Sequence, residues 1–166
     1  MQYNKREKRL LFAAALLVIC STTQIQLNAQ GADSGISKEY IAYCEEIGMQ
    51  YGICPELLEA IIESESSGNA KAQNGECKGL MQIHTHYHKE RMDKLGVTDI
   101  YDAKGNILVA ADYLAELFME HGDMGTVLMV YNGSSDAMER SEKADYTEYA
   151  KKIMKRSAEL ERIHGK

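Results

Sequence analysis

Glu65 is the residue in this sequence best placed to do chemistry, because a helical pattern puts its carboxylate among hydrophobic side chains. At roughly 100° per residue, Leu58, Ile61 and Ile62 form one apolar stripe of such a helix. Glu65 falls within that stripe. A carboxylate that faces a core loses its hydration, which raises its pKa and lets it hold a proton near neutral pH. A general acid requires that protonation state.

The neighbouring acids are predicted to behave differently. Glu56, Glu59 and Glu63 project to the opposite face of the same helix, where carboxylates are ordinarily solvated. The alternative for Glu65 is a helix that has already ended, which would leave this acid exposed in the following loop. The sequence thus offers one well-placed acid on this helix.

Three separated motifs follow one another along the chain: Glu65-Ser66 with Asn69, then Gly79-Leu80-Met81-Gln82-Ile83, then Tyr131-Asn132-Gly133. In order and spacing they resemble the SLT-type lytic transglycosylases, which belong to the lysozyme-like superfamily and have a family 1-like catalytic domain. The resemblance covers roughly residues 37 to 160. It implies a mainly α, lysozyme-like single domain of about five or six helices, with a short hairpin or loop segment lining the groove.

The resemblance also implies a mechanism that needs only one carboxylate. Glu65 would first protonate the glycosidic oxygen between N-acetylmuramic acid (MurNAc) and N-acetylglucosamine (GlcNAc) in peptidoglycan. The same residue would then act as the base that deprotonates the muramyl 6-hydroxyl. Attack of that hydroxyl on its own anomeric carbon gives a 1,6-anhydromuramyl end without water. The substrate's 2-acetamido group would stabilise the intermediate in place of a second carboxylate.

By the same resemblance, five residues would support catalysis or bind substrate: Ser66, Met81, Gln82, Tyr131 and Asn132. Ser66 would hold the helix end beside Glu65, and Tyr131 would donate a hydrogen bond to Glu65. Met81 and Gln82 would line sugar sites, and Asn132 would contact substrate. Three of these roles have a plainer alternative: local hydrogen bonding for Ser66, packing for Met81 and a helix cap for Asn132.

The motif segments also depart from the family pattern in ways that affect substrate fit. The run of small residues expected before Leu-Met-Gln is longer and more polar here, from Gly75 to Gly79, and Gly133 follows Tyr-Asn immediately. Two alternatives to a transglycosylase therefore stay open. One is a hydrolase similar to goose-type lysozymes, and the other is a catalytically inactive peptidoglycan-binding module. The mass of the products would distinguish the hydrolase from a transglycosylase, since hydrolysis adds one water.

Composition and charge restrict the partners. The chain has 166 residues, 45% of them hydrophobic and 27% charged, which suits one globular domain. Residues 1–29 have a basic start and a short apolar run, as in a secretory signal peptide or an N-terminal anchor. Residues 30–36 form a linker, and 37–166 the domain. Without residues 1–29, which hold four basic residues and one acid, the net charge falls from −6 to −9.

So acidic a protein is not expected to bind nucleic acid, because a phosphate backbone is met with clustered basic residues. The expected partner is the peptidoglycan glycan strand, which the protein would hold by short-range contacts. The protein is expected to be a monomer that acts outside the cytoplasm. A cell-envelope secretion, conjugation or phage assembly would be a further partner. No cofactor is expected.

Cysteines and histidines are the other candidate chemical groups. After cleavage Cys44, Cys54 and Cys77 remain, an odd number, and either a Cys54–Cys77 bridge or free thiols would be compatible with the sequence. No Cys/His zinc spacing occurs. Three alternating histidines, His84, His86 and His88, would share one side of a strand. No metal site is expected there, because the following residues look helical and no carboxylate partner is evident.

Helical periodicity and capping signals supply the remaining elements. Ser37 is predicted to cap a helix that runs to about Gln50, and Pro55 to open the helix that carries Glu65. Further helices are expected over residues 106–121, 124–132 and 143–163, with loops at 66–78 and 133–141.

Overall fold

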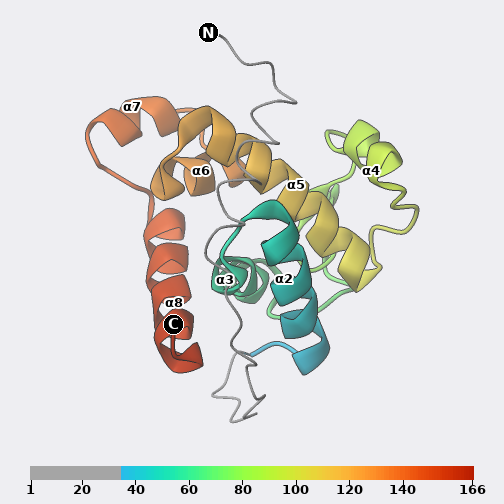
Figure 1. Ribbon diagram of the computed structural model, residues 1–166. Helices are drawn as coiled ribbons and strands as arrows, with labels where there is room; N and C mark the ends of the chain where they lie inside the picture. Colours follow the sequence, from blue (N-terminus) through green and yellow to red (C-terminus); the bar gives the residue numbers. More distant parts are fainter. Residues whose placement is uncertain (1–34) are drawn as a thin grey trace, which may run out of the picture. The chain divides into compact units, whose positions relative to one another are not determined.

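The computed structural model describes residues 35–166, and these are mostly helical (Figure 1). The predicted signal peptide or anchor, residues 1–29, and nearly all of the predicted linker lie outside the described residues. In the described part of the chain, no helix is both long enough and apolar enough to cross a membrane. The expected mainly α class is confirmed, with seven helices in the described part instead of five or six.

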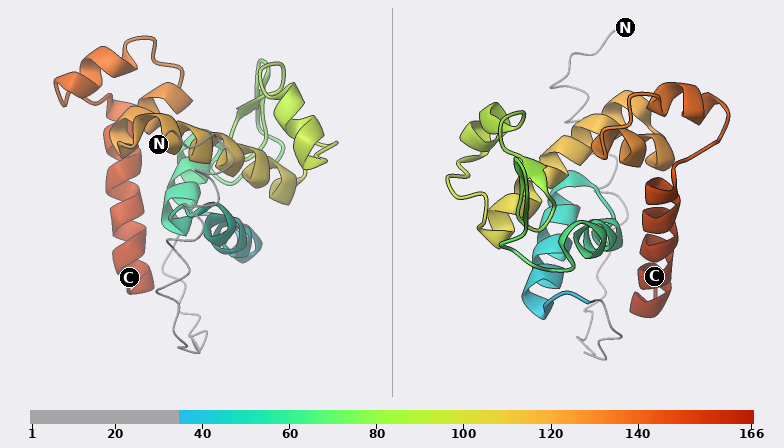
Figure 2. Two further views of the ribbon diagram at one scale, coloured as in Figure 1. Left: turned by 45° about the horizontal axis from the view of Figure 1, so that its top comes forward. Right: turned by 180° about the vertical axis from the view of Figure 1, so that it is seen from behind.

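The helices and strands follow one another in the order α2 (Lys38–Tyr51), α3 (Pro55–Ser66), β1 (Gln73–Asn74), β2 (Cys77–Lys78), β3 (Ile83–His84), α4 (Lys89–Leu95), α5 (Ala103–His121), α6 (Met124–Tyr131), α7 (Ala137–Glu142) and α8 (Glu148–His164). Helix α3 packs against α8 on one side and α2 on the other, and α5 packs against α2 and α6 (Figure 2). The strands and α4 lie across α5 from α8 in both views of Figure 2.

Helix α3 is the central element, and its burial corrects one prediction. The apolar stripe is in the core as expected, with Leu58, Ile61 and Ile62 all 0% exposed. However, Glu56 and Glu59 are also 0% exposed, and therefore do not lie on a solvated face. The periodicity of α3 separates its faces correctly, but α8 covers the face that was predicted to meet water.

The three short strands form the predicted hairpin segment. They pair antiparallel in the order β1-β2-β3, with Asn74 opposite Cys77 and Lys78 opposite Ile83. Gly75 opens the two-residue turn between β1 and β2 and has a positive φ of 59°, which suits glycine. This pairing places β3, which carries the end of the Gly79–Ile83 motif, against α5.

Helix boundaries agree with the capping signals at the N-terminal end of the domain. The side chain of Ser37 accepts a hydrogen bond from Tyr40 N at the start of α2, and Pro55 is in the first turn of α3. Helix α5 begins at Ala103, before the predicted residue 106, because the Asp102 side chain caps it by accepting from Gly105 N at 2.7 Å.

The C-terminal boundaries were predicted incorrectly. The segment 133–141, expected to be a loop, contains α7 (Ala137–Glu142), and the last helix begins at Glu148 instead of about residue 143. Ala144 has a positive φ of 51°, which interrupts any continuous helix. Thr147 then caps α8 by accepting a hydrogen bond from Ala150 N.

The cysteines in the described residues are free thiols. Cys54 precedes α3, and its thiol donates a hydrogen bond to Glu56 Oε2 at 3.0 Å. Cys77 lies near Glu65, at the other end of that helix. Burial raises the pKa of the Cys77 thiol, and the nearby Glu65 carboxylate raises it further. Eleven residues of helix separate the two ends by about 16 Å. A disulfide needs Cα atoms within about 7 Å, so the Cys54–Cys77 bridge is not formed.

Candidate active site

Glu65 lies in the last turn of α3 and is half-buried. Burial raises the pKa of its carboxyl group, and two neighbours oppose that rise: the hydroxyl of Tyr149, which donates a hydrogen bond to Glu65 Oε1, and the positive charge of Lys152. Burial and the Glu65 charge raise the pKa of Tyr149, so this phenol remains a donor. The predicted carboxyl group with a raised pKa is therefore present, supported by a tyrosine from α8.

The supporting tyrosine is not the predicted one. Tyr131 does face inward from α6, but its hydroxyl donates to the carbonyl of Met81 at 2.8 Å, and the predicted Tyr131–Glu65 hydrogen bond is wrong. Both Tyr131 and Tyr149 fall on inward positions of their own helices. Nothing in the sequence says which helix end lies beside Glu65, because that depends on how α6 and α8 pack on α3.

A fully buried asparagine holds the Gly79–Ile83 motif in place, and sequence reasoning missed it. Asn106, 0% exposed on α5, accepts from Met81 N at 2.8 Å and donates to the carbonyls of Lys78 and Ile100 at 3.0 and 2.9 Å. Gly79 packs against the same side chain, since a Cβ at Gly79 would lie 2.2 Å from Asn106 Nδ2. The available signal was its position, because Asn106 lies three and four residues before Val109 and Ala110 and so falls on the apolar face of α5.

Met81 differs from its predicted role, and Gln82 makes structural contacts that its predicted role did not include. The Met81 side chain is 0% exposed, so it packs in the core and does not line a sugar site, as the plainer alternative held. Gln82 is half-buried, with a positive φ of 49°, and its amide nitrogen donates to the carbonyls of Gly79 at 2.9 Å and Ala72 at 3.3 Å. The Gln82 amide group therefore stabilises the turn that presents the motif.

Ser66 and Asn132 occupy helix ends. The Ser66 hydroxyl donates to the carbonyl of Ile62 at 3.2 Å, a local bond that ties the last turn of α3 next to Glu65. Asn132 follows Tyr131 as the C-cap of α6, and its side chain is exposed. Asn132 thus occupies the helix-cap position that was its plainer alternative, and its side chain is also accessible to solvent.

Aromatic rings continue from the site across α5. The Tyr131 and Tyr113 ring centres are 5.7 Å apart, and Tyr113 is 4.5 Å from His88. Burial and the nearby Arg91 charge lower the pKa of His88 to about 4, so this imidazole is neutral at pH 7. His84 stacks instead on Tyr87 at 4.2 Å. The alternating histidines do not share one strand face, because only His84 belongs to β3 and His88 precedes α4.

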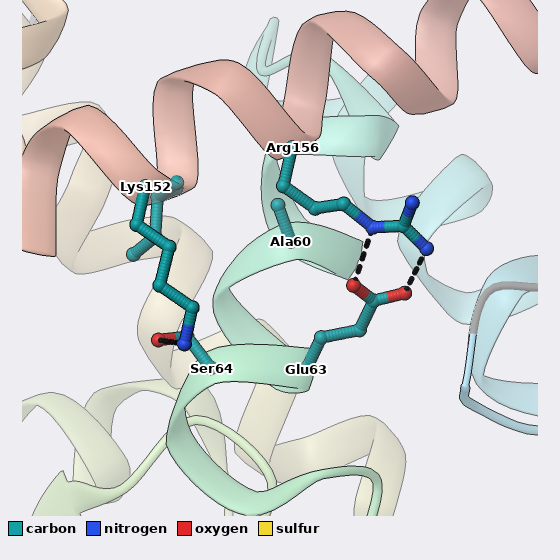
Figure 3. Close-up of a pocket in the computed structure, with 6 residues that line it drawn as sticks. Ala60, Glu63, Ser64, Lys152 and Arg156 are labelled. Carbon is teal, nitrogen blue, oxygen red and sulfur yellow. Dashed lines mark hydrogen bonds and ion pairs between the residues drawn. The ribbon is translucent and has the colours of Figure 1, made fainter.

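A pocket of about 200 Å³ between α3 and α8 shows what the other nearby acid does (Figure 3). Glu63 accepts two hydrogen bonds from the guanidinium group of Arg156, at 2.6 Å from Nε and 2.9 Å from Nη2. Lys152 reaches Ser64 in the same pocket, with Nζ 3.4 Å from Oγ. Glu65 is not part of its lining. The carboxylate of Glu63 is thus engaged by Arg156 and turned away from Glu65.

Comparison with known proteins agrees with this arrangement. The sequence profile of the family described as Transglycosylase SLT domain matches residues 42–154, more than two thirds of the chain. The chain belongs to the transglycosylase SLT domain family. The matched range of the SLT domain contains Glu65, the Gly79–Ile83 motif, Tyr131 and Tyr149, so the residues that the fold brings together all lie inside the family region.

One named relative is similar to this chain over part of its length. A protein called Transglycosylase from Enterobacteria phage PRD1 is 35% identical to this chain over 107 residues. The aligned part is 64% of this chain and 38% of the phage protein. This SLT domain therefore matches well under half of the length of that relative.

Proposed function

We propose that this SLT domain is a lytic transglycosylase that cleaves the β-1,4 bond between MurNAc and GlcNAc in peptidoglycan. The observation that carries the proposal is the half-buried carboxyl group of Glu65, whose pKa is raised by burial and which accepts a hydrogen bond from Tyr149. A carboxyl group in that state can hold a proton near neutral pH and can also, once ionised, take one back.

In the first step, Glu65 donates its proton to the glycosidic oxygen as the bond to the anomeric carbon of MurNAc breaks. The leaving GlcNAc hydroxyl keeps that proton, and Glu65 becomes a carboxylate. The positive charge that develops at the anomeric carbon is met by the carbonyl oxygen of the substrate's own 2-acetamido group. The hydrogen bond from Tyr149 and the charge of Lys152 stabilise the carboxylate that this step creates.

In the second step, ionised Glu65 removes the proton of the muramyl 6-hydroxyl while that oxygen bonds to the anomeric carbon. The acetamido oxygen leaves, a 1,6-anhydromuramyl end forms, and Glu65 is protonated again. No water is consumed. The engagement of Glu63 by Arg156 supports a mechanism with one carboxylate, since the nearest acid on α3 is not available as a nucleophile or as a base for water.

The other motif residues have supporting roles in this proposal. Asn106 and Tyr131 hold the backbone of Met81 from opposite sides, through its N–H and its carbonyl, and so fix the turn that carries Gln82. Gln82 and the exposed Asn132 are proposed to contact the sugars, and Ser66 to steady the end of α3. None of these roles requires a bound cofactor.

The test is mass spectrometry of the soluble muropeptides that the purified protein releases from peptidoglycan. Two amide variants on the same helix form a matched pair. Glu65→Gln should abolish release with the fold intact, because it keeps the shape of the side chain and removes the proton. Glu63→Gln should retain anhydromuramyl products. Circular dichroism of both variants checks folding.

Each other outcome has a clear meaning. Products that carry one additional water on the reducing end would establish a hydrolase on the same scaffold. Full activity of Glu65→Gln would refute the assigned acid. No release by the unmodified protein, together with saturable binding to purified glycan strands, would favour the inactive binding module.

The biological setting follows from the substrate. An enzyme that acts on peptidoglycan works outside the cytoplasm, which is where we place this domain, as a secreted or wall-associated monomer or one anchored through its N-terminal segment. The named relative comes from a phage, which is compatible with a role in a phage, conjugation or secretion assembly that crosses the wall.

A further inference from the structure

Two buried carboxylates and a histidine converge where the start of α3 meets the end of α8. Glu56 and Glu59 come from successive turns of α3, and His164 is the last residue of α8. One potential ligand atom from each of the three lies within 4.8 Å of the others. Both glutamates are 0% exposed, whereas the His164 side chain is 26% exposed. The cluster is therefore closed on the protein side and open to solvent at His164.

Glu59 is the feature of this cluster that needs an explanation. Within residues 35–166, neither Oε1 nor Oε2 of Glu59 has a hydrogen-bond partner. Burying a carboxylate without a partner costs several kcal/mol, and most buried polar groups in proteins are paired for that reason. A carboxylate oxygen of Glu59 lies within 4.8 Å of a ligand atom of Glu56 and of one of His164.

The hydrogen bonds and close ion pairs in the cluster are all made to the other glutamate, Glu56. Glu56 Oε1 is 2.9 Å from His164 Nδ1 and 2.7 Å from Lys166 Nζ, and Glu56 Oε2 accepts from Cys54 Sγ at 3.0 Å. No comparable contact reaches Glu59 among the described residues. A single compact cation between the two carboxylates would compensate both charges at once, which the side chains alone do not do.

We propose that Glu56, Glu59 and His164 form a binding site for a divalent transition-metal ion, with Zn²⁺ as the expected occupant. Two carboxylate oxygens and one imidazole nitrogen are a donor set that suits Zn²⁺, which takes nitrogen and oxygen ligands in tetrahedral geometry. Ca²⁺ and Mg²⁺ prefer oxygen ligands throughout, so the histidine disfavours them. The Cys54 thiol beside Glu56 is a softer donor of the kind that Zn²⁺ also accepts.

The geometry needs only small adjustments. Tetrahedral bonds of about 2.0–2.2 Å place ligand atoms roughly 3.3–3.5 Å apart, so atoms within 4.8 Å of one another need shift little. Lys166, whose side chain is 49% exposed, would move its ammonium group into solvent as the ion takes its place on Glu56.

The ion would have a structural role, independent of the proposed catalysis. It would tie the start of α3 to the end of α8, the two helices that carry Glu65 and Tyr149. Glu59 and Glu65 are six residues apart on α3, which is about 9 Å along the helix axis. The sequence pattern hides such a site because Glu56 and His164 are 108 residues apart.

The experiment is titration of Zn²⁺ into the full-length chain, purified without a histidine tag and dialysed against EDTA, by calorimetry and by thermal unfolding. The variants are Glu59→Gln and His164→Ala. The control is His86→Ala, an exposed histidine outside the cluster. Glu59→Gln keeps the side-chain volume and removes an unpaired charge, so it is expected to fold, and circular dichroism checks each protein.

The expected result is one Zn²⁺ per chain, with the Kd raised at least 30-fold by Glu59→Gln and by His164→Ala and unchanged by His86→Ala. Zn²⁺ should raise the melting temperature of the unmodified chain and not that of Glu59→Gln. Absence of binding at about 100 µM Zn²⁺, a concentration that would reveal even a weak site, would overturn the proposal. So would binding that survives both cluster variants, or that is lost in His86→Ala.

Discussion

Replacing Asn106 by alanine tests how the SLT domain positions its motif turn. Asn106 is fully buried and makes three hydrogen bonds to backbone groups: the N–H of Met81 and the carbonyls of Lys78 and Ile100. Alanine removes all three bonds and supplies no replacement. Two of the affected groups, on Lys78 and Met81, lie on either side of Gly79, so the turn should lose both its anchor and its conformation.

The expected cost follows from those three groups. The bonds to Met81 and Ile100 are buried, whereas the one to Lys78 is only partly so and water can replace it. Leaving a buried backbone group unpaired costs about 1–3 kcal/mol, so two such groups predict a loss of about 2–6 kcal/mol in the free energy of unfolding. That is a large part of the roughly 5–15 kcal/mol by which domains are stable.

Urea unfolding followed by circular dichroism measures this loss. Asn106→Asp separates hydrogen bonding from volume, because it has nearly the same shape but cannot donate to the two carbonyls; it should be at least as destabilising. Asn74→Ala, at an exposed position in β1, is the matched control and should change stability by less than about 0.5 kcal/mol. A loss below about 1 kcal/mol for Asn106→Ala would refute the anchoring role.

Three further predictions concern the active site and its supporting turn. Tyr149→Phe removes the hydrogen-bond donor that lowers the pKa of Glu65, so the pH above which muropeptide release falls should move upward. The value of kcat/KM should drop roughly 10- to 150-fold, which corresponds to the free energy of a hydrogen bond to a charged group. An unchanged pH profile would count against this contact. Burial raises the folded-state pKa of Glu65, so its contribution to stability is present at low pH and is lost as the pH rises through that pKa. Glu65→Gln should therefore stabilise the protein relative to the unmodified chain at pH 8 but not at pH 4. Thermal melts that show the opposite trend would contradict the raised pKa. Gly79→Ala should lower the free energy of unfolding by about 2–4 kcal/mol, because the φ of Gly79 is +81° and the added Cβ would meet Asn106. Gly96→Ala is the control: with φ +70° and open space around it, it should cost only about 1–2 kcal/mol. Equal losses in urea unfolding would exclude the steric contribution.

The part of the site that sequence predicts best is local. Glu65 was placed on the core side of its helix because Ile61 and Ile62, four and three residues before it, define that face. Caps such as Ser37 also depend on neighbours within a few residues, and the structure has that cap as predicted. Such features follow from the geometry of one helix, which the sequence specifies without knowledge of the rest of the chain.

What only the tertiary structure decided is which element covers each face. Periodicity assigned Glu59 to the face of α3 away from the apolar stripe, but it could not show that α8 packs there and buries the carboxylate. In the same way, the sequence predicted Tyr131 as the hydrogen-bond donor to Glu65, whereas the packing of α8 on α3 places Tyr149 there.

The sequence by itself therefore determined the helical class, each family motif and the inward position of the Glu65 carboxyl group, since each of these follows from residues close together along the chain. The tertiary structure decided the donor to that acid, the buried anchor Asn106 and the meeting of Glu56 with His164. The physical reason is that these pairs join residues 25 to 108 positions apart. Their contacts depend on how helices pack in three dimensions, which no short-range pattern encodes.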